Sequence, residues 1–394
     1  MARRWFILAA GIAAQATTSS FLYGMPFLIP ELQRGVGVSL AEAGLLVSAP
    51  LSGLLLALIA WGAAADRYGE RIVMAVGLAA TGGLLLASLA LPGLVAFGAG
   101  LMLAGAAGAS VNAASGRVVL GWFTPSERGL AMGIRQTAQP IGVGLAAATL
   151  PPIAHRWGHE AAVTLPAVLC LVSAVLVLLV VIDPPRPAAS SPGAVASPYR
   201  DEPARTLLRV HSASALLVVP QFVAATFAVT FLASERGWSP VAAGQLVAVV
   251  SVVGAVARVA AGVWSDRVGN RMGPMRVVAL LGMLTMVLWG LGEALGSWLA
   301  VAALVAALIV TVSPNGLGFT ATAELAGPFW AGRAMGVQNT GQNIVAMAAA
   351  PAFGALITVF GYPVALALAA VFPLAGAVLT PVAGERRLAS ARAA

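Results

Sequence analysis

The sequence has 394 residues, of which 60% are hydrophobic and 9% charged, and a mean hydropathy of +0.93. This composition excludes an ordinary soluble globular protein. The formal charge of +8 comes from arginines scattered over short segments, which excludes a nucleic-acid-binding domain, and the single cysteine, Cys170, excludes a disulfide framework and a cysteine metal cluster.

Apolar runs long enough to cross a bilayer follow one another along the chain, separated by polar residues, proline or glycine. The first half is expected to cross at 5–30, 40–63, 72–91, 94–119, 129–150 and 160–182. Residues 184–209 contain six prolines and a charged run and are expected to form an extended linker. The second half is expected to cross at 210–233, 240–263, 275–292, 297–321, 332–357 and 362–382.

These runs predict an all-α membrane protein with twelve transmembrane helices. Its parts are an N-terminal six-helix bundle at 1–183, a cytoplasmic linker at 184–209, and a C-terminal six-helix bundle and tail at 210–394. With the N-terminus inside, only Arg34, Arg156 and Arg236 fall in outside loops. This asymmetry follows the positive-inside rule and predicts that both termini are cytoplasmic.

The two halves carry the same short motifs. Gly62-Ala-Ala-Ala-Asp66-Arg67-Tyr-Gly69-Glu-Arg71 recurs 200 positions later, beginning at Gly262, and the segment that begins at Gly129 recurs 203 positions later at Gly332. Two landmarks at nearly one spacing indicate a parallel pseudo-repeat, an arrangement that places a binding site between the halves near the midplane.

The pattern G-x-x-x-D-R-x-G-x-R, complete from Gly62 to Arg71, resembles the signature loop of the major facilitator superfamily. The resemblance covers the whole chain and implies a secondary transporter that works by alternating access in the bacterial inner membrane. It implies membrane lipid and a small-molecule substrate as partners, a monomer, and no cofactor or metal.

The signature loop is expected to act as a cytoplasmic gate. Asp66 can meet the exposed N–H groups of the helix that begins at Gly332, and Asp266 those of the helix that begins at Gly129. Each contact would favour the state open to the outside, whereas the alternative is a solvated loop that serves topology only. The predicted gating residues are Asp66, Arg67, Arg71, Arg117, Asp266, Arg267, Arg271 and Glu324.

Two arginines fall at bilayer depth, where a guanidinium normally needs a partner. Arg258 and Arg135 lie on the eighth and fifth spans, in segments similar to those of organic-anion carriers of the monocarboxylate, oxalate and cyanate-permease types. In the superfamily these two helices adjoin, so both groups can face one cavity and bind a carboxylate in bidentate geometry. Two alternatives stay open: Arg258 braces the loop or bonds backbone carbonyls, and Arg135 forms a gate salt bridge with Glu324.

Other polar residues within the spans are expected to line the cavity, although each can instead form a hydrogen bond between helices. They are Gln15, Ser19, Tyr23, Asn112, Gln139, Gln221, Thr226, Asn315, Gln338 and Gln342. The acidic residues and the histidines fall at span ends, in loops or in the linker. A coupling proton would therefore travel with the substrate or use an end residue such as Glu31, and anion exchange would need no titrating group.

The function predicted from the sequence is secondary transport of a small organic anion, a mono- or dicarboxylate, by symport with a proton or by anion exchange. Efflux of an amphipathic drug-like compound is one alternative, and a transporter-like receptor is another. An enzyme is not expected, since the sequence has no nucleophile–base set, metal-ligand cluster or nucleotide-binding glycine loop.

Overall fold

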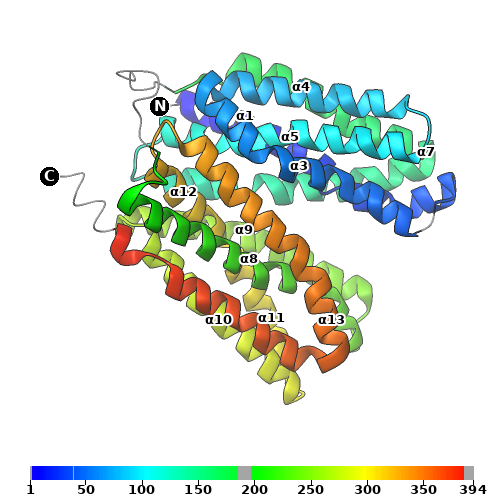
Figure 1. Cartoon of the computed structure of the whole chain (residues 1–394). Coiled ribbons are helices and arrows are strands. Elements are labelled where there is room, and N and C mark those ends of the chain that lie inside the picture. The colour runs from blue at the N-terminus through cyan, green and yellow to red at the C-terminus, as the bar shows by residue number, and fades with distance from the viewer. Residues whose placement is uncertain (1, 39, 185–196, 386–394) are drawn as a thin grey trace. The chain divides into compact units, whose positions relative to one another are not determined.

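The computed structural model describes residues 2–38, 40–184 and 197–385, and every element in these ranges is helical (Figure 1). The first elements are α1 (Ala2–Leu22), η1 (Met25–Leu28), α2 (Ile29–Glu31), η2 (Leu32–Val36), α3 (Leu40–Tyr68), α4 (Glu70–Leu89), α5 (Leu94–Trp122), α6 (Arg128–Arg135) and α7 (Ala138–Val180). They are followed by α8 (Asp201–Ser234), α9 (Pro240–Val268), α10 (Met272–Ala294), α11 (Leu299–Val310), α12 (Pro314–Ala326) and α13 (Ala331–Leu379).

Ten helical segments of the described chain are long and apolar enough to cross a membrane. Two of them are interrupted by a glycine with positive φ, at Gly158 in α7 (84°) and Gly361 in α13 (76°). Glycine reaches this backbone region without steric cost, so each long element turns there and supplies two spans. The prediction of an all-helical membrane protein with twelve spans is confirmed at the level of the fold, with about ten to twelve membrane-length helices in the described chain.

Helix α8 begins nine residues earlier than the span expected to start at 210. Arg200 is its N-cap residue and Pro203 lies in its first turn, where a missing N–H removes no helical hydrogen bond. The second part of the expected linker is therefore helical, and residues 185–196 of that linker lie outside the described residues. The earlier start moves His211 from the end of a span to the interior of a helix.

The chain folds as two compact units. Unit 1 comprises 1–123, 137–190 and 327–337, and unit 2 comprises 124–136, 191–326 and 338–394. Each unit thus contains a short segment from the other sequence half. The division into halves at 1–183 and 210–394 stays a prediction about the sequence.

Close helix packing in unit 1 depends on glycines that face backbone atoms. A Cβ atom on Gly53 of α3 would lie 1.8 Å from Met102 O, and one on Gly105 of α5 would lie 2.0 Å from Pro50 O. Small residues let two helices approach in this way within a membrane, where lipid offers no hydrophobic drive for association. The α3–α5 pair consequently forms a close contact that fixes Arg117 relative to Asp66.

In unit 2 the core is built around aromatic side chains. Trp289 and Phe231 are fully buried, with ring centroids 5.2 Å apart, and the ring centroid of Tyr362 lies 5.1 Å from that of Phe231. Both pairs are edge-to-face, the geometry that aromatic quadrupoles favour. This cluster joins α8, α10 and α13.

Candidate functional site

Asp66, near the end of α3, caps the first turn of α13. Gly332 N and Arg333 N donate to its two carboxylate oxygens at 3.0 and 3.1 Å. The carboxylate satisfies N–H groups that have no partner within the helix and meets the positive end of the helix dipole. The contact is the one that the sequence predicted for Asp66, and its role as a gate stays a prediction.

Arg117 on α5 holds two buried carboxylates in unit 1. Its Nη1 lies 2.8 Å from Asp66 Oδ1, and its Nε lies 2.9 Å from Glu70 Oε1. The three side chains are 4%, 2% and 0% exposed, for Arg117, Asp66 and Glu70. Glu70 was not among the predicted site residues, because an acidic residue directly after Gly69 resembles a loop residue, whereas α4 begins at Glu70 and this side chain is buried.

The other two arginines of the signature loop lie differently from each other. The backbone N of Arg71 donates to Asp183 Oδ1 at 2.8 Å, and its Nε donates to Leu178 O at 3.0 Å. Arg67 is exposed, with its guanidinium 5.3 Å from the centroid of the Tyr68 ring. Arg71 therefore ties the loop to the end of α7, and Arg67 does not take part in the buried cluster.

Unit 2 repeats the capping contact. Gly129 N and Leu130 N, in the first turn of α6, donate to Asp266 Oδ1 and Oδ2 at 2.9 and 2.8 Å. Asp266 lies near the end of α9, as Asp66 lies near the end of α3. The repeated sequence motif therefore forms the same helix-capping contact in both units.

Arg271 is the centre of a second ion-pair cluster. Its guanidinium pairs with Asp266 and lies 3.2 Å from Glu324 Oε1, while its Nη2 donates to Pro125 O at 2.6 Å. Burial by itself would lower the pKa of Arg271, but the negative charges of Glu324 and Asp266 outweigh it and raise the pKa above its ordinary value. Arg271 stays cationic at the loop, whereas Arg267 is exposed.

Pairs of glycines make both capping contacts possible. A Cβ atom on Gly62 would lie 2.4 Å from Gly332 O, and one on Gly262 would lie 2.0 Å from Gly129 O. Neither separation is possible for real atoms, so any larger residue would push the capped helix away from the aspartate. The glycine of the signature motif is thus explained by close approach of two backbones.

Arg135 and Arg258 both donate hydrogen bonds to Gln136 in unit 2. Arg135 Nη1 donates to the side-chain Oε1 of Gln136 at 2.9 Å, and Arg258 Nη1 donates to its backbone O at 2.8 Å. The two arginines are only 3% and 8% exposed. The contact of Arg258 with a carbonyl is the one that the alternative interpretation expected, and among the described residues Arg258 forms no ion pair.

Each unit contains a glutamine–asparagine pair that joins its first long helix to the matching later helix. Gln15 Nε2 donates to Asn112 Oδ1 at 3.4 Å in unit 1, and Asn315 Nδ2 donates to Gln221 Oε1 at 3.0 Å in unit 2. Gln342 Nε2 extends the second pair by donating to Asn315 Oδ1 at 3.4 Å. Five of the predicted cavity residues therefore lie in two amide networks.

The remaining predicted cavity residues are placed less uniformly. Ser19 is buried where α1 crosses Gly142 of α7, whose added Cβ atom would lie 2.7 Å from Ser19 Cβ. Tyr23 packs against the apolar core of unit 1, Gln139 is half-buried and Thr226 is exposed. Of the three predicted cavity residues near the start of the chain, Gln15 thus lies in an amide network, whereas Ser19 and Tyr23 take part in packing.

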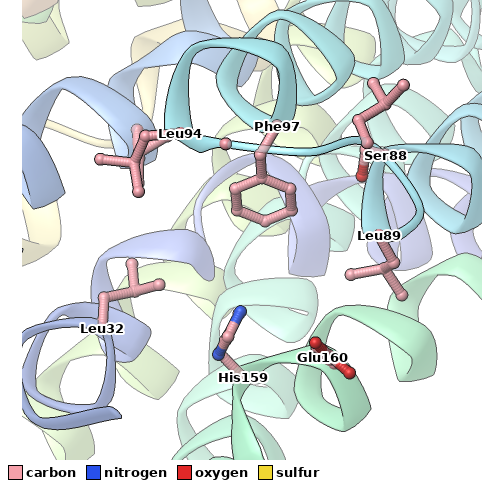
Figure 2. A pocket seen from close by; sticks show the side chains of 10 residues that line it. Leu32, Ser88, Leu89, Leu94, Phe97, His159 and Glu160 are labelled. Carbon is pink, nitrogen blue, oxygen red and sulfur yellow. The ribbon is translucent and has the colours of Figure 1, made fainter. Parts of the chain in front are cut away.

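A cavity of about 170 Å³ lies in unit 1 at the end of α4 opposite the signature loop. Figure 2 shows His159 and Glu160 of α7 on one side and Phe97 and Leu94 of α5 above them. Its lining is Leu32, Leu46, Ser88, Leu89, Leu91, Gly93, Leu94, Phe97, His159 and Glu160. None of the residues that the sequence predicted for substrate binding lines this cavity.

Known proteins resemble this chain over most of its length. The model of the Major Facilitator Superfamily matches residues 7–350. The chain belongs to the major facilitator superfamily. An uncharacterized MFS-type transporter of Mycobacterium tuberculosis is 45% identical over 381 residues, which cover 96% of this chain and 85% of the relative.

Solved superfamily structures share the fold at low sequence identity. The E. coli fucose:proton symporter is 14% identical, with a TM-score of 0.73 and coverage of 95% of this chain and 98% of the symporter. The human organic anion transporter MFSD10 is also 14% identical, with a TM-score of 0.68 and coverage of 96% and 99%. At such identities the likeness establishes the fold alone.

Membership of the major facilitator superfamily makes this chain a secondary transporter, and not an enzyme, that spans the membrane several times and binds a small-molecule substrate. The superfamily prediction made from the signature loop is confirmed. The similarity to organic-anion carriers stays a prediction, because one fold serves many solutes.

Proposed function

We propose that this superfamily member transports a small organic anion, a mono- or dicarboxylate, by alternating access. The single observation that carries the proposal is the meeting of Arg135 and Arg258 at Gln136. Gln136 is a neutral residue, so it supplies hydrogen-bond acceptors but no negative charge.

Comparison with the other buried arginines supports this proposal. Arg117 pairs with Asp66 and Glu70, and Arg271 pairs with Asp266 and Glu324. Arg258 is buried to a similar degree but has no carboxylate partner in the described part of the chain. A guanidinium at membrane depth costs at least about 2.5–3.5 kcal/mol, and an anionic solute that binds beside it offsets this cost.

The guanidinium fork also favours a carboxylate over other solutes. One nitrogen of Arg258 is used by Gln136 O, and no other hydrogen bond joins its guanidinium to a described residue. A carboxylate can accept two parallel N–H bonds from such a fork, which gives geometric specificity as well as charge complementarity. We assign the amide networks of Gln15 and Gln221 to solute selectivity.

The gate belongs to the same proposal. We assign the Asp66–Gly332 and Asp266–Gly129 contacts to one state of the transport cycle and their loss to the other. Each aspartate and the helix that it caps come from different halves of the sequence, so relative movement of these segments would break the contact. Arg117, Arg271 and Glu324 would stabilise the capped state.

The test compares ligand-induced stabilisation of purified variants in detergent. Arg258→Ala and Arg135→Ala should lose the rise in melting temperature that a panel of mono- and dicarboxylates produces in the wild type, while both remain folded without ligand. Arg258→Lys keeps the charge but loses the fork, so it should weaken binding about tenfold, as expected for one charge-assisted hydrogen bond.

Arg276→Gln is the matched control, because Arg276 is an exposed arginine on α10. It should respond to carboxylates like the wild type. Normal stabilisation of both alanine variants would contradict the proposed anion site. Stabilisation of the wild type by many amphipathic compounds, and not by carboxylates, would favour the efflux alternative.

We also propose a bacterial inner-membrane location, a monomer, and cytoplasmic termini. A membrane location in bacteria agrees with the mycobacterial relative, and the orientation rests on the arginine-poor loops at one side. A C-terminal alkaline phosphatase fusion should be inactive and a green fluorescent protein fusion fluorescent, whereas the opposite pattern would reverse the assigned orientation.

A further inference from the structure

His211 on α8 lies at the centre of a buried polar chain in unit 2. Its Nε2 lies 3.0 Å from Tyr199 Oη, and its Nδ1 lies 3.0 Å from Gln338 Oε1 on α13. Thr322 on α12 donates to the same oxygen of Gln338. The chain therefore leads from the segment before α8 to residues within the membrane-spanning helices.

Both neighbours of His211 suit either protonation state. The imidazolium form donates from both nitrogens, and Gln338 Oε1 and Tyr199 Oη can each accept. In the neutral form with hydrogen on Nδ1, the Tyr199 hydroxyl rotates and donates to Nε2. In the neutral form with hydrogen on Nε2, Tyr199 Oη accepts and the Gln338 amide can turn to donate to Nδ1. A proton can therefore bind and leave without depriving either neighbour of a hydrogen bond, which is the property required of a site that takes up and releases protons.

Charged groups on the elements around His211 are already engaged elsewhere. Glu324 on α12 pairs with Arg271 and Arg128, Arg209 on α8 donates to Leu379 O and Val378 O, and Arg258 on α9 donates to Gln136 O. On α10, Arg276 is exposed and Glu293 pairs with Arg236, and on α13 Arg333 pairs with Asp66, whereas α11 has no titratable residue. Among the side chains that the structure describes, no charged group contacts His211, so a bound proton would add one full positive charge to this chain of residues.

Gln338 provides the link to the predicted cavity. Gln338 is 1% exposed and its Nε2 has no partner among the described residues, and the same is true of the Oγ of Ser214, which is 2% exposed. Both atoms face Gly318, where an added Cβ atom would lie 3.1 Å from Gln338 Nε2 and 2.6 Å from Ser214 Oγ. The backbone O of Ser214 accepts a hydrogen bond from Gln342 Nε2 at 3.3 Å.

The amide of Gln338 has two orientations that respond to His211. An imidazolium needs acceptors, so it holds Oε1 toward His211 and the NH₂ group toward Ser214. A neutral imidazole with its lone pair on Nδ1 instead accepts from the NH₂ group after a half-turn of the amide, which brings Oε1 toward Ser214. The Thr322 hydroxyl can donate to one orientation and accept from the other.

We propose that His211 is a proton-binding site of this transporter and that Gln338 transmits its protonation state to the network of Gln342, Asn315 and Gln221. The inference goes beyond the proposed solute, because it holds for any solute that the carrier moves with or against a proton. Imidazole is the side chain whose ordinary pKa, about 6.5, allows this near neutral pH.

The test is NMR titration of histidine-labelled protein in detergent between about pH 4 and pH 9, a range that extends well below an imidazole's ordinary pKa. The His211 signal is assigned by its loss in His211→Gln, and the exposed His155 is an internal control. We expect His211 to titrate, with a midpoint that falls in Gln338→Leu, because that change removes the oxygen that accepts from the imidazolium. The midpoint should also change in Thr322→Val, because the Thr322 hydroxyl donates to the same oxygen.

A His211 signal that stays in one neutral form across the whole range would overturn the proton site. Titration with the same midpoint in the wild type and in both folded variants would overturn the role of Gln338. Having two variants protects the test against a fold defect in one of them. Since no solute is added, these outcomes are independent of whether carboxylates bind at Arg258.

Discussion

Asp66 and Asp266 show how one residue type serves the same purpose at two loops. Each accepts two backbone N–H groups at the start of another helix, and each pairs with a buried arginine. A carboxylate in this position is supported by charge, by hydrogen bonds and by the helix dipole together.

Asp66→Asn should therefore destabilise the folded protein, since the amide keeps one acceptor but loses the charge that faces Arg117 and the helix end. We expect a cost of about 1–3 kcal/mol, the range for an imperfectly paired buried group, measured as a lower melting temperature in detergent. Arg67→Gln changes the next residue of the same motif, which is exposed, and should change stability by less than about 0.5 kcal/mol. Equal effects of the two substitutions would show that the cap contributes nothing.

Motif position alone predicted the partner of Asp66, because a helix N-terminus is an anion site wherever it occurs. The sequence did not predict the burial of Glu70 or the role of His211. Glu70 follows the glycine of the motif, and its inward direction depends on where α4 starts. His211 was placed at a span end because proline and charged residues hid the early start of α8.

Close packing of the helices depends on glycines at the points where two helices cross. Gly62 and Gly262 each face the backbone of a capped helix, whereas Gly44 on α3 and Gly244 on α9 have no atom within 4 Å of an added Cβ. Helix α3 thus contains a glycine that faces a neighbouring backbone, Gly62, and one that does not, Gly44. Helix α9 contains the matching pair, Gly262 and Gly244.

Gly62→Ala and Gly262→Ala should each cost about 1–3 kcal/mol, since the added methyl group forces the capped helix to shift. Gly44→Ala and Gly244→Ala should be neutral or stabilising by up to about 1 kcal/mol, because alanine favours the helix over glycine. Thermal unfolding of the four variants in detergent measures these effects. A similar loss of stability in all four would contradict the assigned close crossings.

The spans themselves were largely predictable, because apolar length and glycine breaks are local properties of the sequence. Gly158 and Gly361 lie between the expected spans and turn the chain there. The break between α6 and α7, next to Gln136, was not predicted, since it falls within the single span expected at 129–150. That break exposes the Gln136 carbonyl to Arg258, a tertiary contact that periodicity alone does not reveal.

For the whole molecule, the internal repeat makes two compact units with matching caps and matching glutamine–asparagine pairs. The buried arginines at Gln136 do not follow this repeat: the position that matches Arg135 in the second half is Gln338, which lies beside His211. We therefore assign Arg135 to binding of the solute's charge. Its counterpart, Gln338, is assigned to the response to a proton on His211.

Solute flux in proteoliposomes measures whether a passenger anion neutralises Arg258 during transport. Wild type and Arg276→Gln should show saturable uptake of a labelled carboxylate, and Arg258→Gln should reduce that flux at least about tenfold, as expected when a charge-assisted hydrogen bond is lost. Equal carboxylate flux in Arg258→Gln and wild type, or transport of neutral sugars in place of any anion, would contradict the account.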